Sequence, residues 1–399
     1  MVPQASQRNL AYWLSAGIVL FFLGDLMRLV AHELDWSFTR FTGYSKMFYL
    51  IILGVLFLQH KRIQSQGTLE LLVCIVVTTL SFLAGCALLD LPFDQLLSYN
   101  YPYFMRLLYL PLALLVFRES SRAYSHIPLR VVEYLFWINA GIIGLALLFE
   151  LDLFRTYYPP RFGYKGFYDR NTTITIIALM LSVVYLYGWM HKRNLKALAG
   201  LIGVVAVCLI LGPKKTLLLP LAVVAFLALS RKRTRTPILI TAMVALIVVV
   251  LFQEPIIAWL RDFNPLIADL YDRRGLISAV TSLRSDLLQQ MTTVFIPEHW
   301  SIGNYVTGGG YFRILRTEMD LLDVYFLTGV FGLICTGYVY GKHVIRSIWH
   351  HPLGKFFVAV FLFFALVSSG VIYNADLALY LIAFTWYFTY HIYPIREQV

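Results

Sequence analysis

The charged residues that could do chemistry are concentrated in one polar segment, which runs from Phe252 to Leu321. This segment carries Arg284 and ends in the stretch Arg313-Ile-Leu-Arg-Thr-Glu-Met-Asp320. A guanidinium group is always charged and binds phosphate oxygens through a bidentate fork, and a carboxylate can remove the proton of an attacking hydroxyl group. Because almost all of the remaining chain is apolar, the segment predicts catalysis at a membrane surface on a lipid-linked substrate.

The composition of the chain predicts an all-α polytopic membrane protein. Hydrophobic residues make up 59% and charged residues only 14% of the 399 positions, and the mean hydropathy is +0.70, well above the balance of a soluble domain. An α-helix needs about 20 apolar residues to cross the hydrocarbon core. We therefore expect one integral membrane domain over residues 1–399, with about twelve transmembrane helices at residues 10–30, 43–59, 69–90, 102–118, 130–150, 172–190, 195–212, 215–231, 236–253, 321–340, 353–372 and 375–393.

Basic residues predict the orientation of these helices, because short basic loops of membrane proteins stay in the cytoplasm. Alternate connections are basic: His60-Lys61-Arg62, Arg118 with Arg122, Lys192-Arg193, Arg231 to Arg235, and Lys342 to Arg346. Both termini are therefore expected in the cytoplasm, whereas the large 253–320 loop and the smaller 151–171 loop lie outside. Much of the net charge of +11 is then a topology signal, and it gives no support to nucleic-acid binding.

The large outer loop is expected to be partly helical. Apolar residues between Ile277 and Phe295 recur every three or four positions, which is typical of an amphipathic helix. Further on, Gly308-Gly309-Gly310 indicates a turn that is flexible or that another backbone approaches closely. The four cysteines lie in predicted membrane helices, so we expect free thiols and neither a disulfide nor a metal site.

Several short motifs follow one another in a recognisable order. Arg161-Phe-Gly-Tyr-Lys-Gly166 and Asn171 stand at the entry of one span, and Gly212-Pro-Lys-Lys-Thr216 forms an outer turn. Ser282-Leu-Arg284 comes next, before the glycine-rich turn and Glu318-Met-Asp320-Leu-Leu-Asp323. This order resembles the Wzy-type O-antigen polymerase and O-antigen ligase superfamily, bacterial inner-membrane enzymes that transfer glycans from undecaprenyl diphosphate. The resemblance covers about residues 150–335 and implies a GT-C-like glycosyltransferase fold with metal-independent catalysis at the outer (periplasmic) face.

The resemblance favours the polymerase branch of this superfamily. The ligase branch usually carries a histidine shortly before the span that follows the large loop, whereas this chain has Glu318 and Asp320 there and its loop histidine, His299, lies well upstream. The polymerase branch implies an undecaprenyl-diphosphate-linked oligosaccharide as donor and another as acceptor. It implies that no cofactor is needed. It also implies membrane lipids and a chain-length regulator protein as partners.

Cationic side chains would stabilise the charge that a sugar diphosphate leaving group acquires as its glycosidic bond breaks. Arg161 and Arg284, from two separate outer loops, are the first choices for this catalytic role. Further candidates for substrate binding are Lys215, Lys214, Lys165, Arg170, Asn171, Tyr164, Arg313 and Arg316. Of these, Tyr164 could stack on a sugar ring, and the last two arginines could instead reach lipid headgroups or pair with Glu318.

Glu318 is the candidate general base that activates the acceptor hydroxyl group. Asp320 is a second catalytic candidate, although residues two apart project to different sides of a helix; Asp323, at i+3, could support it. Other charged residues are expected to be structural. Asp25 and Arg28, one turn apart, predict an ion pair, and Arg273 beside Asp269 predicts a solvated salt bridge, while Arg106 and Asp376 lie near span ends and need no special role.

The predicted reaction moves a growing glycan from its lipid diphosphate carrier to a new lipid-linked repeat, with inversion, because one displacement without a protein nucleophile inverts the anomeric carbon. The near alternative is a ligase that transfers finished glycan to the lipid A core. An alternative of another class is a lipid-linked oligosaccharide flippase or transporter. That class predicts a central pathway lined by intramembrane charges, and few charges lie deep inside the predicted spans.

Overall fold

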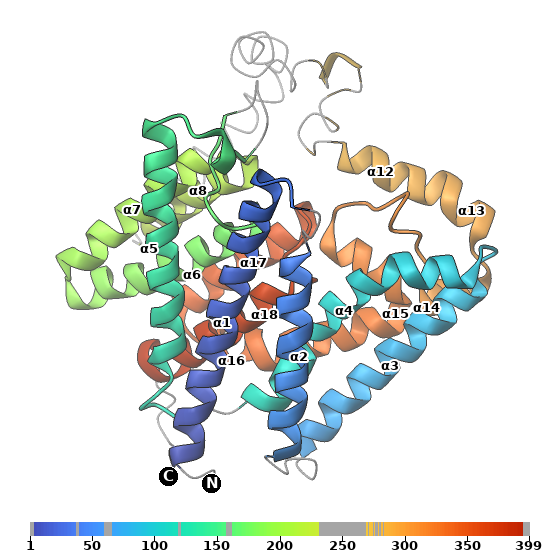
Figure 1. Cartoon of the computed structure of the whole chain (residues 1–399), viewed down its shortest axis with the longest axis horizontal. Helices are drawn as coiled ribbons and strands as arrows, with labels where there is room; N and C mark the ends of the chain where they lie inside the picture. Colours follow the sequence, from blue (N-terminus) through green and yellow to red (C-terminus); the bar gives the residue numbers. More distant parts are fainter. Residues whose placement is uncertain are drawn as a thin grey trace.

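The computed structural model describes residues 4–36, 40–59, 66–118, 121–156, 162–230, 269, 271–273, 275, 278, 281 and 283–393. This part of the chain is helical throughout (Figure 1) and contains no strand; its one sheet-like feature is an isolated antiparallel bridge between Arg155 and Tyr164. The helical class that the composition predicts is confirmed.

The long helices are α1 (Gln4–Glu33), α2 (Phe41–Gln59), α3 (Gln66–Leu88), α4 (Phe93–Phe117), α5 (His126–Leu148), α6 (Asn171–Lys192), α7 (Leu195–Leu211), α8 (Lys214–Leu229), α15 (Asp320–Tyr340), α17 (Pro352–Val367) and α18 (Ala375–Tyr387). Among the described residues between α8 and α15, the structure has the short helices α12 (Arg284–Gln290), α13 (Ile296–His299) and α14 (Ile302–Thr307). Single π-helical turns join α12 to α13 and extend α15 and α18, at Met291–Phe295, Gly341–Ile345 and Phe388–Ile392.

Six stretches within the described residues are long and apolar enough to cross a membrane. They are Gln7–Glu33, Phe41–Gln59, Gly67–Leu88, His126–Leu148, Asn171–Lys192 and Asp320–Ile348. Three shorter apolar helices are Leu195–Leu211, Lys215–Leu229 and Pro352–Val367. The predicted segments 10–30, 43–59, 69–90, 130–150, 172–190 and 321–340 fall on the six long stretches. The segment 236–253 lies outside the described residues, and the count of about twelve spans stays a prediction.

Two helices form the centre of the molecule. Every residue of α18 from Ala375 to Trp386 is buried, and so is every residue of α6 from Thr172 to Val183. A helix that is covered on all faces belongs in the interior. Around this centre, α1, α4 and α5 pack against α18, α7 and α17 pack against α6, and α3 packs against α15. Figure 1 shows α1, α2 and α5 upright, with α3, α4 and α15 to one side.

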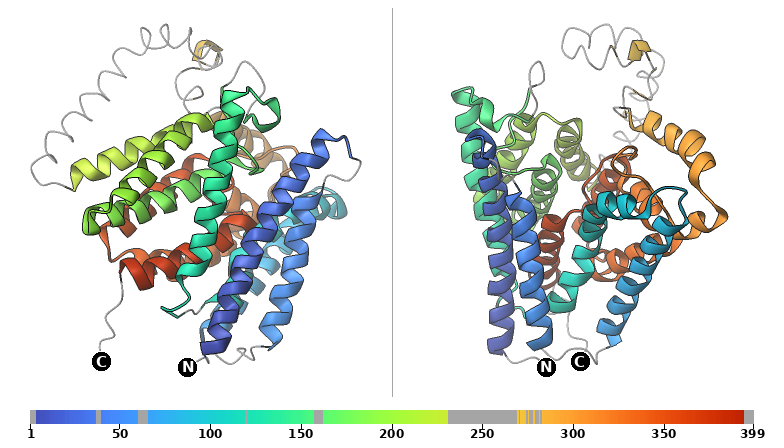
Figure 2. Two further views of the ribbon diagram at one scale, coloured as in Figure 1. Left: turned by 60° about the vertical axis from the view of Figure 1, so that its left-hand side comes forward. Right: turned by 45° about the vertical axis from the view of Figure 1, so that its right-hand side comes forward.

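The loop that precedes α15 is only partly described. The amphipathic helix predicted over 277–295 is present from Arg284, where α12 begins, to Phe295, and Met291 and Phe295 are its buried residues. Figure 2 shows α12 and α13, in gold, at the edge of the helical body on the side of α3 and α4. The cysteines are free thiols, as expected; Cys74, Cys86 and Cys208 are buried and Cys335 is partly exposed.

Candidate active site

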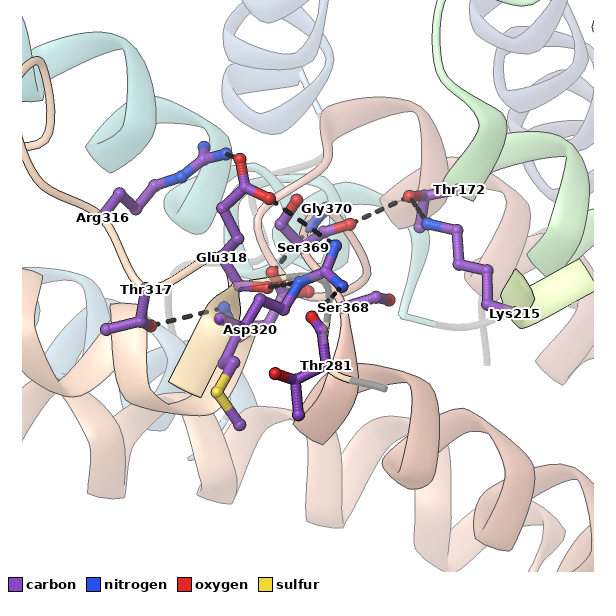
Figure 3. A network of polar contacts seen from close by, with 12 residues as sticks. Thr172, Lys215, Thr281, Arg316, Thr317, Glu318, Asp320, Ser368, Ser369 and Gly370 are labelled. Carbon is purple, nitrogen blue, oxygen red and sulfur yellow. Dashed lines mark hydrogen bonds and ion pairs between the residues drawn. The ribbon is translucent and has the colours of Figure 1, made fainter. Parts of the chain in front are cut away.

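Three long helices begin at one place, and a chain of hydrogen bonds connects their starts. Lys215, in the first turn of α8, donates from Nζ to Oγ1 of Thr172 in the first turn of α6. Thr172 in turn donates to the carbonyl of Ser369 over 2.9 Å. The next amide, that of Gly370, donates over 2.7 Å to Oδ1 of Asp320, where α15 begins. Figure 3 shows this chain of hydrogen bonds. The N-terminus of a helix carries a partial positive charge, so helix starts that lie together favour a bound anion.

Arg284 and Glu318 meet across a separation of 34 residues. Nε of Arg284 donates to the carbonyl oxygen of Glu318 over 3.0 Å, and Nη1 donates to the carbonyl of Thr281 over 3.1 Å. Nη2 lies 3.6 Å from the carboxylate oxygen Oε2 of Glu318. The backbone contacts fix the guanidinium plane of Arg284, a cation chosen from the sequence, beside Glu318, the candidate base.

A second guanidinium group lies on the other oxygen of the same carboxylate. Nη2 of Arg316 is 3.5 Å from Oε1 of Glu318, and the Glu318 side chain is 43% exposed. Arg316 also lies 3.7 Å from Oδ2 of Asp323 and sits over the rings of Tyr103 and Tyr373, at 5.3 and 5.9 Å from their centroids. Glu318 is therefore a solvent-accessible carboxylate between two arginines.

The backbone is strained at both sides of this pair. Leu283, the residue before Arg284, has φ of 70°, and Glu318 has φ of 57°. Non-glycine residues rarely adopt this left-handed region, and such strain costs of order 1–3 kcal/mol and is concentrated at functional sites. The strained residues deliver the Arg284 and Glu318 side chains to each other.

Asp320 has a different environment from Glu318. It is fully buried, and its carboxylate accepts hydrogen bonds from the amides of Gly370, Val371 and Ile372. Those bonds occupy both oxygens and fix the loop between α17 and α18 to the start of α15. Asp320 thus positions the backbone beside the site and has no surface for a substrate, which argues against the catalytic role considered for it.

Asp323 holds the segment that carries Glu318 in place. It forms no hydrogen bond with Asp320. Its Oδ1 accepts from the amide and hydroxyl of Thr317, over 2.9 and 2.7 Å. Its Oδ2 accepts from the hydroxyl of Tyr373. The carboxylate therefore anchors the residue immediately before Glu318 and one of the two rings under Arg316.

Two further cations predicted from the sequence lie at the site. Asp320, Arg284, Glu318 and Arg170 are all close enough to act electrostatically on Lys215. Arg170 precedes α6, and its Nη1 lies 3.5 Å from the position that a β-carbon would take at Gly370. Beside it, Oδ1 of Asn171 is buried without a hydrogen-bond partner among the described residues. The residues immediately before α6 and α15 therefore come together here, beside the start of α8.

Arg106, expected from the sequence to have no special role, lies beside the site. Its guanidinium group lies 5.4 Å from the centroid of Tyr103 and is electrostatically coupled to Arg170. Within the described residues, neither Arg106 nor Arg170 forms an ion pair or donates a hydrogen bond. The only charged residue between Pro102 and Phe117, Arg106, was the available signal, because such residues in spans mark functional sites by default.

Other candidates lie elsewhere. The ring of Tyr164 is buried, 5.9 Å from Arg155, which leaves no face for a sugar. Lys165 donates to the carbonyl of Asp169 over 3.3 Å. Arg313 is exposed and lies over Tyr99, 4.3 Å from its centroid. Arg161 and the side chain of Lys214 lie outside the described residues. Arg273 pairs with Asp269 over 2.7 Å in an exposed salt bridge, as expected.

A second polar cluster lies on the other side of Arg170. Arg28 pairs with Asp169, and the amide of Asp169 donates to Asp25 over 3.1 Å, so the predicted ion pair between Asp25 and Arg28 is wrong. Lys46 lies 2.9 Å from Asp376. This cluster fixes the residue before Arg170 to α1, and it gives Asp376, expected to have no special role, an ion pair in the interior.

Comparison with known protein families, with curated proteins and with solved structures found no match to this chain.

Proposed function

We propose that the protein is a membrane glycosyltransferase of the O-antigen polymerase type. It transfers a growing glycan from undecaprenyl diphosphate to the non-reducing-end sugar of a new lipid-linked repeat. In this proposal the chain crosses the bacterial inner membrane about twelve times in a GT-C-like arrangement, with both termini in the cytoplasm and the site at the outer face. The observation that carries the proposal is the meeting of cations from separate segments around one accessible carboxylate, Glu318.

The charge balance of the site suits a diphosphate. Its cationic side chains are Arg106, Arg170, Lys215, Arg284 and Arg316, and its carboxylates are Glu318, Asp320 and Asp323. The excess of positive charge is partly buried, where an uncompensated charge is costly. A lipid-linked sugar diphosphate, with one ionised oxygen on each phosphorus, supplies the missing negative charge.

The chemistry requires one displacement. The acceptor hydroxyl oxygen forms a bond to the anomeric carbon of the donor sugar, while the bond from that carbon to the diphosphate oxygen breaks. The electron pair stays on the diphosphate, where Arg284, Lys215 and Arg170 stabilise it, and the hydroxyl proton passes to Glu318. No protein nucleophile takes part, so the configuration at the anomeric carbon inverts.

The test is replacement of Arg284 by alanine, assayed in membrane fractions supplied with purified lipid-linked repeats. Loss of one fixed donor to a developing charge lowers the rate on the order of 10²–10³-fold, so Arg284→Ala should yield short glycans in small amounts. Arg273→Ala removes the same side chain from an exposed salt bridge in the same loop and should leave polymerisation unchanged. Glycan of wild-type length and amount from Arg284→Ala would exclude the assigned role.

The ligase alternative differs only in the acceptor. The same preparation is offered both lipid-linked repeats and lipid A core; transfer to core lipid alone would replace the polymerase assignment.

One observation favours the transporter class as a second candidate. Asp25 and Asp376 are buried, and the partly buried Lys46 pairs with Asp376, so charged groups gather among α1, α2 and α18. A transferase forms glycosidic bonds in detergent solution, whereas a flippase needs a sealed membrane and leaves the repeat unit unchanged. Assay of detergent-purified protein for glycan elongation therefore separates the two classes.

A further inference from the structure

The segment 300–312 belongs by sequence to the large polar loop, yet it packs deep between two candidate membrane-spanning helices. Oγ of Ser81 in α3 lies 3.4 Å from the carbonyl of Thr307 and donates over 2.8 Å to that of Thr328 in α15. Ser81 is seven residues from the end of α3 at Leu88, and Thr328 is eight residues from the start of α15. At about 1.5 Å per residue, α14 reaches on the order of 10–12 Å along both helices.

Both helices provide the space that α14 needs. A β-carbon at Gly85 of α3 would lie 2.7 Å from the carbonyl oxygen of Thr307, and one at Gly329 of α15 would lie 2.1 Å from that of Val306. Gly329 also breaks the regular geometry of α15, with φ of 62° and ψ of −164°. The two glycines therefore accept a third backbone between them.

The irregular backbone after α14 is hydrogen-bonded by protein groups. The carbonyls of Gly308, Gly309 and Gly310 accept from the side chains of Asn304, Trp300 and Asn100, at 2.7, 2.8 and 2.6 Å. The amides of Gly309 and Phe312 donate to the carbonyl of Phe326 and to Oδ1 of Asn100, at 2.9 and 3.1 Å. A loop in water can leave these groups to solvent, whereas non-helical backbone at membrane depth must find protein partners.

The outward face of α14 is apolar and exposed. Ile302 is 88% exposed, and Tyr305 and Val306 lie on the same open side, whereas Asn304 is buried. This face is continuous with the exposed apolar surfaces of the flanking helices, which include Leu80, Leu83 and Leu88 of α3 and Val330, Phe331 and Ile334 of α15. Those neighbours belong to candidate membrane spans, so a bilayer around them would also meet the outward face of α14.

We propose that residues 300–312 form a re-entrant element, which enters the bilayer from the side of the 283–320 segment, and that α14 presents Ile302, Tyr305 and Val306 to the acyl chains of membrane phospholipids. The chain continues directly from residues 300–312 to Arg316 and Glu318, so the re-entrant element connects the site to the hydrocarbon region. The proposal rests on packing and hydrogen bonding and is independent of the proposed transfer reaction.

Spin labels measure the environment of α14 directly. Ile302→Cys is labelled in the full chain, with Cys335→Ala as background because Cys335 is the partly exposed native thiol, and is reconstituted into vesicles of phosphatidylethanolamine and phosphatidylglycerol. Leu80→Cys on the lipid-facing side of α3 and Gln290→Cys on exposed α12 are the hydrocarbon and water controls. All three positions are exposed, so the substitutions leave the packed interior intact.

The readout is collision of the label with oxygen, which concentrates in hydrocarbon, and with a neutral nickel chelate, which stays in water. The label at Ile302 should match the one at Leu80, with oxygen accessibility several-fold above nickel accessibility. A label that matches Gln290, with nickel accessibility dominant, would place α14 in water and overturn the proposal. Low accessibility to both reagents would mean that protein covers this face, and would overturn it as well.

Discussion

At the scale of single residues, the contacts of Glu318 are loose enough to be exchanged. Its carboxylate lies 3.6 Å from Arg284 and 3.5 Å from Arg316, whereas a strong charge-assisted hydrogen bond measures about 2.7–2.9 Å. A phosphate group can therefore take the place of Glu318 on Arg284 at little cost. In the proposed reaction, this exchange would bind the donor diphosphate and free the carboxylate for the acceptor hydroxyl group.

Replacement of Glu318 by glutamine tests this exchange. Glutamine keeps the shape of the side chain but cannot accept a proton, so kcat should fall roughly 10²–10⁴-fold. The free energy of unfolding should stay within about 0.5 kcal/mol of the wild-type value, because the side chain is on the surface. Single-turnover elongation with purified lipid-linked repeats measures the first quantity and a detergent unfolding curve the second. Asp269→Asn, at the exposed pair with Arg273, is the control. An unchanged kcat in Glu318→Gln would show that Glu318 is not the general base.

Asp320→Asn should have the opposite signature. An asparagine at this buried position turns an NH₂ group toward backbone amides that now donate to the carboxylate, and a buried donor without a partner costs about 1–3 kcal/mol. The unfolding temperature should therefore fall clearly, whereas the folded fraction should retain its elongation rate to within about tenfold. A stable protein with an elongation rate as low as that of Glu318→Gln would instead make Asp320 a catalytic residue.

Residue types and motif order singled out Arg284, Glu318, Lys215 and Arg170, and the structure places these four residues near one another. The sequence could not separate Glu318 from Asp320, because the two differ only in burial and in the loop 368–372 that folds back onto one of them. Tyr164 was an equally reasonable candidate for stacking, and its ring is instead covered by the residues around Arg155. The local sequence pattern gives the chemistry of a side chain, but it does not determine which residues surround that side chain in the folded protein.

At the scale of elements, the short re-entrant segment depends on two glycines of α15 and α3. Long apolar runs predicted the six long apolar helical stretches, because such a run is by itself a strong signal for a span. A stretch of nine residues from Ile302 to Gly310 is too short for that signal, and only the triple glycine indicated a close backbone approach. That approach is present: a β-carbon at Gly308 would lie 2.5 Å from the amide nitrogen of Gly329.

Gly329→Ala should displace α14. The new methyl group would meet the carbonyl of Val306, and alanine would have to adopt φ of 62° and ψ of −164°, a region that essentially only glycine occupies. Overpacking and strain together cost at least about 2 kcal/mol. Gly337→Ala is the matched control, because it lies in the same helix with no atom within 4 Å of its β-carbon position, and it should be neutral or stabilise by about 0.5–1 kcal/mol. Thermal unfolding in detergent compares the two; equal stabilities would mean that α14 does not pack at Gly329.

At the scale of the whole molecule, the site and the basic connections occupy opposite ends of the same helices. α6 runs from Asn171, beside Arg170, to Lys192, and α15 with its π-helical extension runs from Asp320 past Lys342. Each of these stretches is long enough to cross the bilayer. The sequence could not order the helices in space, since periodicity gives the face of a helix but not its neighbour, yet the charge pattern along the chain already separated the two ends.

This separation predicts which positions share a side of the membrane. By the preference of basic loops for the cytoplasm, reporters fused after Lys192 and after Ile348 should be cytoplasmic, whereas one fused after Gln290 should be exported. A fluorescent protein that matures only in the cytoplasm and a phosphatase that folds only outside give complementary signals at each position. If Gln290 and Lys192 report from one side, α6 does not separate the site from the basic end, and a diphosphate displayed at the outer surface could not reach Arg284.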